Sequence, residues 1–179
     1  MRGFVLLLIG AGLFAADKRP VTPEDYFLFA NVADPQISPD GKLVAYTVTR
    51  VDAEQNRRNS EVWLAAIDGL APPRQLTTAG SATSPRWRPD GKALAFLGGR
   101  PAQVQLLPMD GGEARRITSL KNGVTAFAWS PDGARLVCVS RAGAPERPTD
   151  TRHYFSSFYK FNGRSFFDTM RTHLWVVAA

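Results

Sequence analysis

Residues 37–46 read ISPDGKLVAY, and the same pattern returns as WRPDGKALAF at 87–96 and as WSPDGARLVC at 129–138. In each copy a Pro-Asp-Gly turn separates two apolar segments. Proline presets the backbone of the first central turn position, aspartate can bond backbone amides two residues on, and glycine accepts a positive φ without steric cost. Each copy is therefore predicted to form a tight β-hairpin.

Each of the first two copies has a second half with another turn signal. The segment 61–77 runs from EVWLAAI through Asp-Gly to RQLT, and the segment 103–118 runs from QVQLLPM through Asp-Gly-Gly to RRIT. Asp-Gly is a common hairpin turn, so each unit is predicted to hold four strands. The first unit is longer because it carries the polar insertion DAEQNRRNS at 52–60, which we expect to form a surface loop.

The spacing of the copies indicates the architecture. The turn glycines Gly41, Gly91 and Gly133 lie 50 and 42 residues apart, close to the roughly 40–45 residues of a four-stranded propeller blade. Segments 43–46 and 93–97 are apolar on both faces, whereas a sheet with one wet face alternates. A β-sandwich would also bury such strands, but the fixed repeat favours stacked blades. The predicted fold class is all-β: an incomplete β-propeller of about three four-stranded antiparallel blades.

The first 16 residues are expected to be a signal peptide rather than part of the fold. A basic start at Arg2 leads into the apolar stretch FVLLLIGAGLF (4–14), and two alanines precede the polar residues 17–20. This is the layout of a secretory signal peptide. Eleven helical residues cover about 16 Å, against a bilayer core of about 30 Å, so a spanning helix is not expected. Periplasmic or extracellular export is predicted, with an uncleaved anchor as the alternative.

A short helix is predicted ahead of the first blade. Thr22 offers an N-cap, Pro23 suits the first helical turn, and two acidic residues follow near the positive helix end. The apolar residues expected on one face of this helix, packed against the propeller, are Tyr26, Phe29, Ala30 and Ala33. The predicted division of the chain is a signal peptide (1–16), an N-terminal segment with a short helix (17–34), and a partial propeller (35–179) with blades at about 35–79, 84–120 and 124–179.

The third blade is expected to be incomplete. Trp63 precedes the Asp68 turn by five residues, and the position five residues after Trp175 lies beyond Ala179. Propellers usually close with four to eight blades, so three blades cannot form a ring. We therefore interpret the chain as an incomplete sequence or a truncated gene product, and we expect its exposed edges to cause self-association.

The order of helix and repeats resembles the N-terminal propeller of prolyl oligopeptidase-family serine peptidases, in particular the acylaminoacyl-peptidase and dipeptidyl-peptidase-like branch. The resemblance covers about residues 20–179, and the segments that carry it are TPED (22–25), DPQISPDGK (34–42), SPRWRPDGK (84–92), MDGGE (109–113), AWSPDG (128–133) and RTHLWVV (171–177). It implies a propeller that sits over a hydrolase active site and restricts entry to small peptides. TolB-like propellers share the repeat, so a non-enzymatic periplasmic interaction scaffold is the alternative.

The chemistry of that family is not expected in this chain. Family members carry a Ser-Asp-His triad on a C-terminal α/β-hydrolase domain with a G-x-S-x-G nucleophile elbow, and the sequence holds no such pentapeptide. His153 and His173 are expected to be structural or solvated strand residues. No catalytic, cofactor-binding or metal-binding residue is predicted, and peptide substrates would be bound only through a catalytic domain missing from this chain.

Composition excludes further functions. The 22 Lys and Arg against 16 Asp and Glu give +6, but they are scattered, whereas nucleic-acid binding needs a concentrated basic face. The single cysteine, Cys138, excludes an internal disulfide and a multi-cysteine zinc site, and is expected to be a buried strand residue.

The stretch 141–171 is polar and then aromatic. It is expected to be an inserted hairpin whose rings pack on the blade, with a substrate- or domain-contacting hairpin as the alternative.

Overall fold

The computed structural model describes residues 19–143, 160–161, 165–166 and 171–179. Its elements in chain order are the 3-10 helix η1 (Pro23–Leu28) and the strands β1 (Ala30–Ile37), β2 (Leu43–Asp52), β3 (Arg57–Ala66), β4 (Arg74–Gln75), β5 (Thr83–Trp87), β6 (Ala93–Gly98), β7 (Gln103–Pro108), β8 (Arg115–Arg116), β9 (Ala126–Trp129), β10 (Arg135–Ala142), β11 (Lys160–Phe161), β12 (Ser165–Phe166) and β13 (Arg171–Ala178). The predicted signal peptide, residues 1–16, lies outside the described residues.

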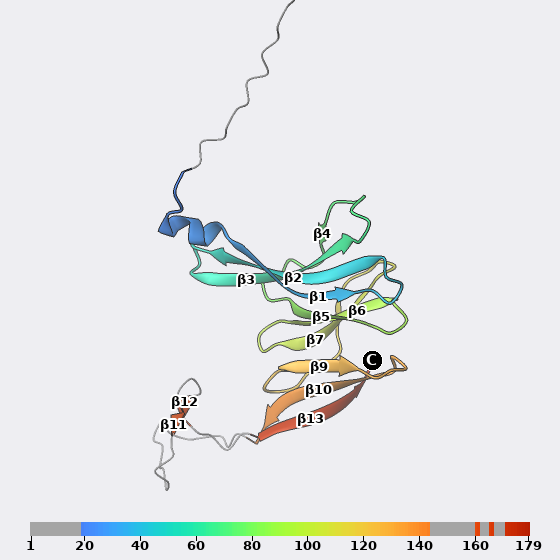
Figure 1. The fold of residues 1–179 in the computed structure, drawn as a ribbon. Coiled ribbons are helices and arrows are strands. Elements are labelled where there is room, and N and C mark those ends of the chain that lie inside the picture. The colour runs from blue at the N-terminus through green and yellow to red at the C-terminus, as the bar shows by residue number, and fades with distance from the viewer. Residues whose placement is uncertain (1–18, 144–159, 162–164, 167–170) are drawn as a thin grey trace, which may run out of the picture.

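Three antiparallel sheets stack face to face (Figure 1), and β11 and β12 form a separate two-stranded sheet. The first sheet has the order β1-β2-β3-β4, the second β5-β6-β7-β8, and the third β13-β10-β9. Each of the three stacked sheets begins with a hairpin around a Pro-Asp-Gly turn, and consecutive strands of each complete sheet are neighbours. The predicted fold class, all-β with about three blades of an incomplete propeller, is confirmed.

The three Pro-Asp-Gly turns form as the sequence predicts. In the first, the N–H of Gly41 donates to the carbonyl of Ser38 at 2.9 Å, and Gly41 has a φ of +72°. The carboxylate of Asp40 accepts a hydrogen bond from the N–H of Lys42, two residues on, at 3.2 Å. Gly91 and Gly133 repeat the backbone bond at 2.9 Å, with φ of +72° and +68°. A glycine is needed here because a Cβ strains this left-handed backbone.

Burial follows the position of each sheet in the stack. Strand β6 of the middle sheet is buried at every residue, because its two faces contact different neighbours. Strand β10 of the third sheet alternates, with Leu136 and Cys138 buried toward the second sheet and Val137 exposed on the other face. The sequence prediction that stacked blades cover both faces of apolar strands therefore holds for the middle sheet. Among the described residues, no further sheet covers the other face of either outer sheet.

Two apolar cores fill the spaces between the sheets. Leu94 and Phe96 of the second sheet pack against Ala45, Val62 and Leu64 of the first. On the opposite face, the second and third sheets meet through a core of Ala93, Ala95, Leu97, Val104, Leu106, Val124, Phe127, Leu136 and Cys138. Adjacent positions along β6 thus serve two different interfaces, which is the period-2 geometry of a strand.

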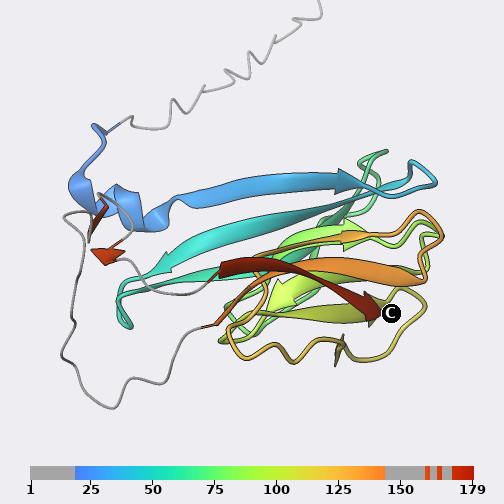
Figure 2. The ribbon, with the colours of Figure 1, turned by 90° about the horizontal axis from the view of Figure 1, so that it is seen from below.

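The helix prediction is only partly right. A helix forms at Pro23–Leu28, but Ala30 belongs to strand β1, so the expected four-residue apolar face does not exist. Tyr26 and Phe29 are 55% and 60% exposed rather than packed against the propeller. The helix ends early because Ala30 pairs with Arg50 of the long strand β2 and so belongs to the first sheet. The first strand therefore begins before the expected propeller boundary at residue 35. Figure 2 shows η1 at the start of β1.

The prediction of a surface loop at 52–60 is wrong. The pairing of β2 with β3 continues out to Asp52 and Arg57, and only the residues between them form a turn. The polar insertion therefore lengthens the hairpin instead of leaving the sheet. Alternating Thr, Val, Arg and Asn side chains suit such an extended, half-exposed ribbon.

The insertion at 141–171 is described only in part. Strands β11 and β12 pair antiparallel, with Phe161 opposite Ser165, so the predicted hairpin is present. The packing of its rings, and His153, lie outside the described residues.

Candidate functional site

The first strands of the three sheets, β1, β5 and β9, contact one another in sequence and carry a repeated hydrogen bond. The indole N–H of Trp87 on β5 donates to the carbonyl of Gln36 on β1 at 2.9 Å. The indole N–H of Trp129 on β9 donates to the carbonyl of Arg86 on β5 at 3.2 Å. Gln36 and Arg86 occupy the same position of their blades. The same hydrogen bond, from an indole N–H to a backbone carbonyl, therefore joins consecutive blades.

The first blade differs at this position. Ile37 stands where the next blades have Trp87 and Trp129, and an isoleucine side chain has no N–H to donate. Ile37 is exposed, because the described residues place no sheet against that side of the first blade. The tryptophan hydrogen bond thus joins neighbouring blades, and Ile37 of the first blade cannot make it.

A polar cluster lies beside this contact. The guanidinium of Arg86 on β5 donates from Nη1 to Asp34 Oδ2 on β1 at 2.7 Å and to its neighbour's carbonyl, Pro85 O, at 2.6 Å. Asp34 also accepts from the side-chain amide of Gln36, at 2.8 Å on Oδ1. The Arg86 side chain is 36% exposed and that of Asp34 is 29% exposed. One ion pair therefore ties the first two blades together while remaining open to solvent.

Backbone irregularities direct these side chains. Asp34 and Ser84 both have positive φ, at 52° and 55°, and each precedes a proline. The register of β1 and β5 shifts at these places, between Ala33 and Gln36 and between Thr83 and Arg86. A bulge re-aims a side chain and increases the local twist. The two bulges bring Asp34 and Arg86, which are 52 residues apart in sequence, into contact.

The groups of this cluster are hydrogen-bonding and charged groups that could bind a ligand. A guanidinium binds carboxylates and carbonyl oxygens, and a carboxylate binds amino groups and N–H donors. An extended peptide carries all of these groups. The sequence prediction did not identify Asp34, Gln36 or Arg86, although the alignment of the repeats places Gln36 and Arg86 at one position and could have pointed to them.

Of the two histidines that the sequence analysis considered, His173 lies in the described part of the chain. It is exposed on β13, in register with Ser140 on β10. The Ser140 hydroxyl is buried and donates to the carbonyl of Gly123. Cys138 is fully buried, as predicted, and burial raises the pKa of its thiol. Within the described ranges no group of three or more His, Cys, Asp or Glu could hold a metal ion.

Two hollows outside this cluster are lined by other elements. A groove of about 400 Å³ runs between the end of the first blade and the second blade, with Leu76, Phe96 and Leu107 on its walls. Another, of about 320 Å³, lies between η1 and the long hairpin, where Tyr26 and Arg58 meet. The Arg58 guanidinium donates to the Tyr26 hydroxyl at 3.1 Å. Among the described residues, no helix combines the length and apolar character needed to cross a membrane.

Comparison with known proteins connects this architecture to peptidases. A peptidase of Bacillus subtilis, YuxL, is 35% identical over 140 residues, which are 74% of this chain and 21% of that protein. Dipeptidyl-peptidase 5 of Porphyromonas endodontalis is 31% identical over 165 residues, covering 89% of this chain and 23% of the relative. The structure of acylaminoacyl peptidase from Pyrococcus horikoshii matches with a TM-score of 0.69 and 25% identity over 84% of this chain and 23% of that chain.

A TolB homologue of Chlorobium luteolum is also similar, at 31% identity over 63% of this chain and 24% of its own length. No family model matches the chain. The chain spans between a fifth and a quarter of the length of each of these proteins.

Repeat, sheet order and blade contacts define a β-propeller region. It matches the propeller region of acylaminoacyl peptidase and dipeptidyl-peptidase 5, and TolB-like homologues are also similar to it.

Proposed function

We propose that this chain is the non-catalytic N-terminal propeller of an exported serine peptidase, where it restricts the access of peptides to an α/β-hydrolase domain. The observation that carries the proposal is that 74% and 89% of the chain match about a fifth of two larger peptidases. The sequence itself supplies no nucleophile elbow. Hydrolysis would therefore reside elsewhere in the parent protein.

The polar cluster supports the restricting role. The first strands of the blades contact one another, so they are the strands nearest the propeller axis. Asp34 and Arg86 are half-exposed there and are tied to each other. A peptide passing along this surface meets a fixed carboxylate and a fixed guanidinium. Because the pair also joins two blades, it holds them at a fixed separation, which limits the size of what can pass.

Export is the proposed location, and it rests on the N-terminal pattern of a basic start, an apolar stretch and small residues. The mature protein would begin near Asp17. N-terminal sequencing of the protein from an envelope fraction tests this. An intact Met1 on cytosolic protein would contradict it.

The peptidase role is tested on the native product. An antibody raised against residues 19–143 should recover a species several times larger than the 19.6 kDa of this chain. That species should react with a serine-directed fluorophosphonate, and heat denaturation before labelling should abolish the reaction. Recovery of an unlabelled native species would contradict the proposal.

A TolB-like interaction scaffold without enzymatic activity is the second candidate, favoured by the similarity to the TolB homologue. The reading frame beyond Ala179 distinguishes the two. A downstream G-x-S-x-G followed by Asp and His supports the peptidase, whereas further blades followed by a stop codon support the scaffold.

A further inference from the structure

The groove of about 400 Å³ between the first two blades has one wall from each blade. The first blade contributes residues of the segment 76–82, which follows β4, and the second contributes residues of β6, β7 and the turn at 112–114. The hydroxyl of Ser81 accepts from the N–H of Gly99 at 3.1 Å and joins the two walls. Both sheets have all four strands, so the groove is a feature of a complete interface between blades.

One position on the third strand of each blade explains why this groove is open. In the second and third blades this position faces the preceding blade, because its partner on the second strand is buried in that interface. The residues at this position, each with its partner, are Trp63 with Tyr46, Gln105 with Phe96, and Trp175 with Cys138. Two of the three blades therefore place an indole ring here, and the second blade has a glutamine instead.

A glycine beside Gln105 leaves further space. Gly98 occupies the place that Val48 and Ser140 take in the other two blades. A Cβ at Gly98 would lie 3.2 Å from Gln105 Cγ and from a ring carbon of Phe96, so a side chain would be crowded here. At the next interface, Ser140 and Trp175 line the equivalent hollow, which measures about 250 Å³. The groove of the second blade thus lacks both side chains that narrow its counterpart.

The lining of the groove suits an aromatic ring with a positive charge. Leu76, Phe96 and Leu107 are its large apolar residues, and ligand pockets are mostly apolar with a few polar groups that fix orientation. Among the described residues, the half-buried amide of Gln105 has no hydrogen-bond partner and the exposed carboxylate of Glu113 has no ion-pair partner. Of the described residues that line the groove, Glu113 alone carries a charge. A carboxylate binds a cation and repels an anion.

We propose that this groove binds an aromatic ring that carries a protonated amine. The ring lies in the space that the missing indole leaves at position 105, and a ring N–H donates to the Gln105 side-chain oxygen. The ammonium group lies at Glu113. A volume of about 400 Å³ falls within the range of small-molecule pockets, about 300–1,000 Å³. This inference rests on the interface between two complete blades and does not depend on the proposed peptidase role.

Tryptamine is the probe, because it joins an indole ring to an amine, and isothermal titration calorimetry on the full chain measures its binding. Tryptamine should bind saturably and more tightly than neutral indole, and the anion indole-3-acetate should bind more weakly than indole. Glu113→Gln should weaken tryptamine about twofold to fivefold, as expected for an exposed ion pair, and should leave indole unchanged. Glu54→Gln removes the same charge from the exposed turn of the long hairpin and should change neither.

Two variants of Gln105 test the position of the ring. Gln105→Trp copies the residue of the other two blades, fills the groove, and should abolish the binding of tryptamine and indole. Gln105→Leu keeps the groove but removes the acceptor, so indole should bind about twofold to tenfold more weakly. The affinity for 1-methylindole, which has no N–H, should not change in Gln105→Leu.

Three results would overturn the proposal. The first is the absence of saturable tryptamine binding. The second is binding that survives in Gln105→Trp, which would place the ligand on another apolar surface. The third is an equal loss in Glu113→Gln and Glu54→Gln, which would reduce the effect to the net charge of the chain. Because Glu113 and Glu54 are exposed, these two variants decide the matter even if Gln105→Trp does not fold.

Discussion

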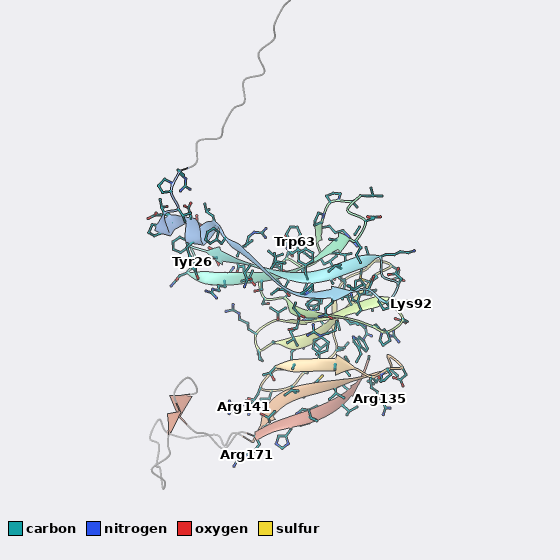
Figure 3. All side chains as sticks on the ribbon, in the orientation of Figure 1. Tyr26, Trp63, Lys92, Arg135, Arg141 and Arg171 are labelled. Atoms are coloured by element: carbon teal, nitrogen blue, oxygen red, sulfur yellow. The ribbon has the colours of Figure 1, made fainter. Side chains whose placement is uncertain are left out.

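Replacing Trp87 with phenylalanine should destabilise the protein more than the same replacement at Trp63. Both tryptophans are half-buried strand residues, so the loss of ring size is matched. The Trp87 N–H bonds to Gln36 across the blade interface at 2.9 Å, whereas the Trp63 N–H is buried without a partner. Trp63 lies on the first sheet (Figure 3), and its ring has the Arg50 guanidinium 5.5 Å from the centroid, an attraction that a phenylalanine ring also provides.

The size of the difference follows from these contacts. Trp87→Phe loses a hydrogen bond with a net value of about 0.5–1.5 kcal/mol, and it also leaves the Gln36 carbonyl short of a donor. Trp63→Phe loses no hydrogen bond and removes an unsatisfied buried donor. The free energy of unfolding should therefore fall by about 1–3 kcal/mol more for Trp87→Phe.

Urea unfolding followed by far-ultraviolet circular dichroism measures this difference, because the signal does not depend on the tryptophans that are replaced. The slope of the transition must stay the same for the comparison to hold. An equal or larger loss in Trp63→Phe would refute the reasoning that the tryptophan contact joins consecutive blades.

Three further outcomes are expected. Asp40 and Asp132 should titrate below the ordinary aspartate range, because a serine hydroxyl and a backbone N–H hold the pKa of each carboxyl down. The stability they add is complete above the unfolded-state pKa and is lost as pH falls through the lower folded-state pKa; carboxyl NMR midpoints at or above the ordinary value would contradict this. Cys138 should resist thiol reagents until the protein unfolds, because burial raises its pKa; rapid labelling of native protein would count against it. Isolated residues 17–179 should self-associate in sedimentation through bare apolar faces, and a soluble monomer with one sharp reversible transition would show otherwise.

The hairpins were predictable from sequence because their causes are local. Proline, aspartate and glycine each fix one part of the turn, and the observed bonds of Asp40 and Gly41 are those that the residue types predict. The stacking followed from apolar strands at a fixed repeat. Both inferences use short stretches of chain whose preferences agree with the final fold.

Pairing over longer distances could not be predicted in the same way. Ala30 and Ala33 were expected on the helix, and alanine has the highest helix propensity. Both residues instead pair with the long strand β2, and this pairing outweighs that preference. The contact between Asp34 and Arg86 depends on two bulges and on the angle between blades. The hydrogen bonds from the Thr77 hydroxyl to Glu61 and from the Thr118 hydroxyl to Gln103 could not be predicted either. They depend on the register of the strands, and a glutamate and a glutamine share no obvious sequence pattern.

The chain matches the propeller region of peptidases, and we propose that the catalytic centre lies in another part of the parent protein. The most direct measurement compares the purified chain with the native product on one aminoacyl or acyl-peptide chromogenic substrate. The chain alone should release no product above the buffer rate, whereas the native product should turn over the substrate and be stopped by a serine-directed inhibitor. Turnover by the purified chain that the same inhibitor abolishes would contradict the claim.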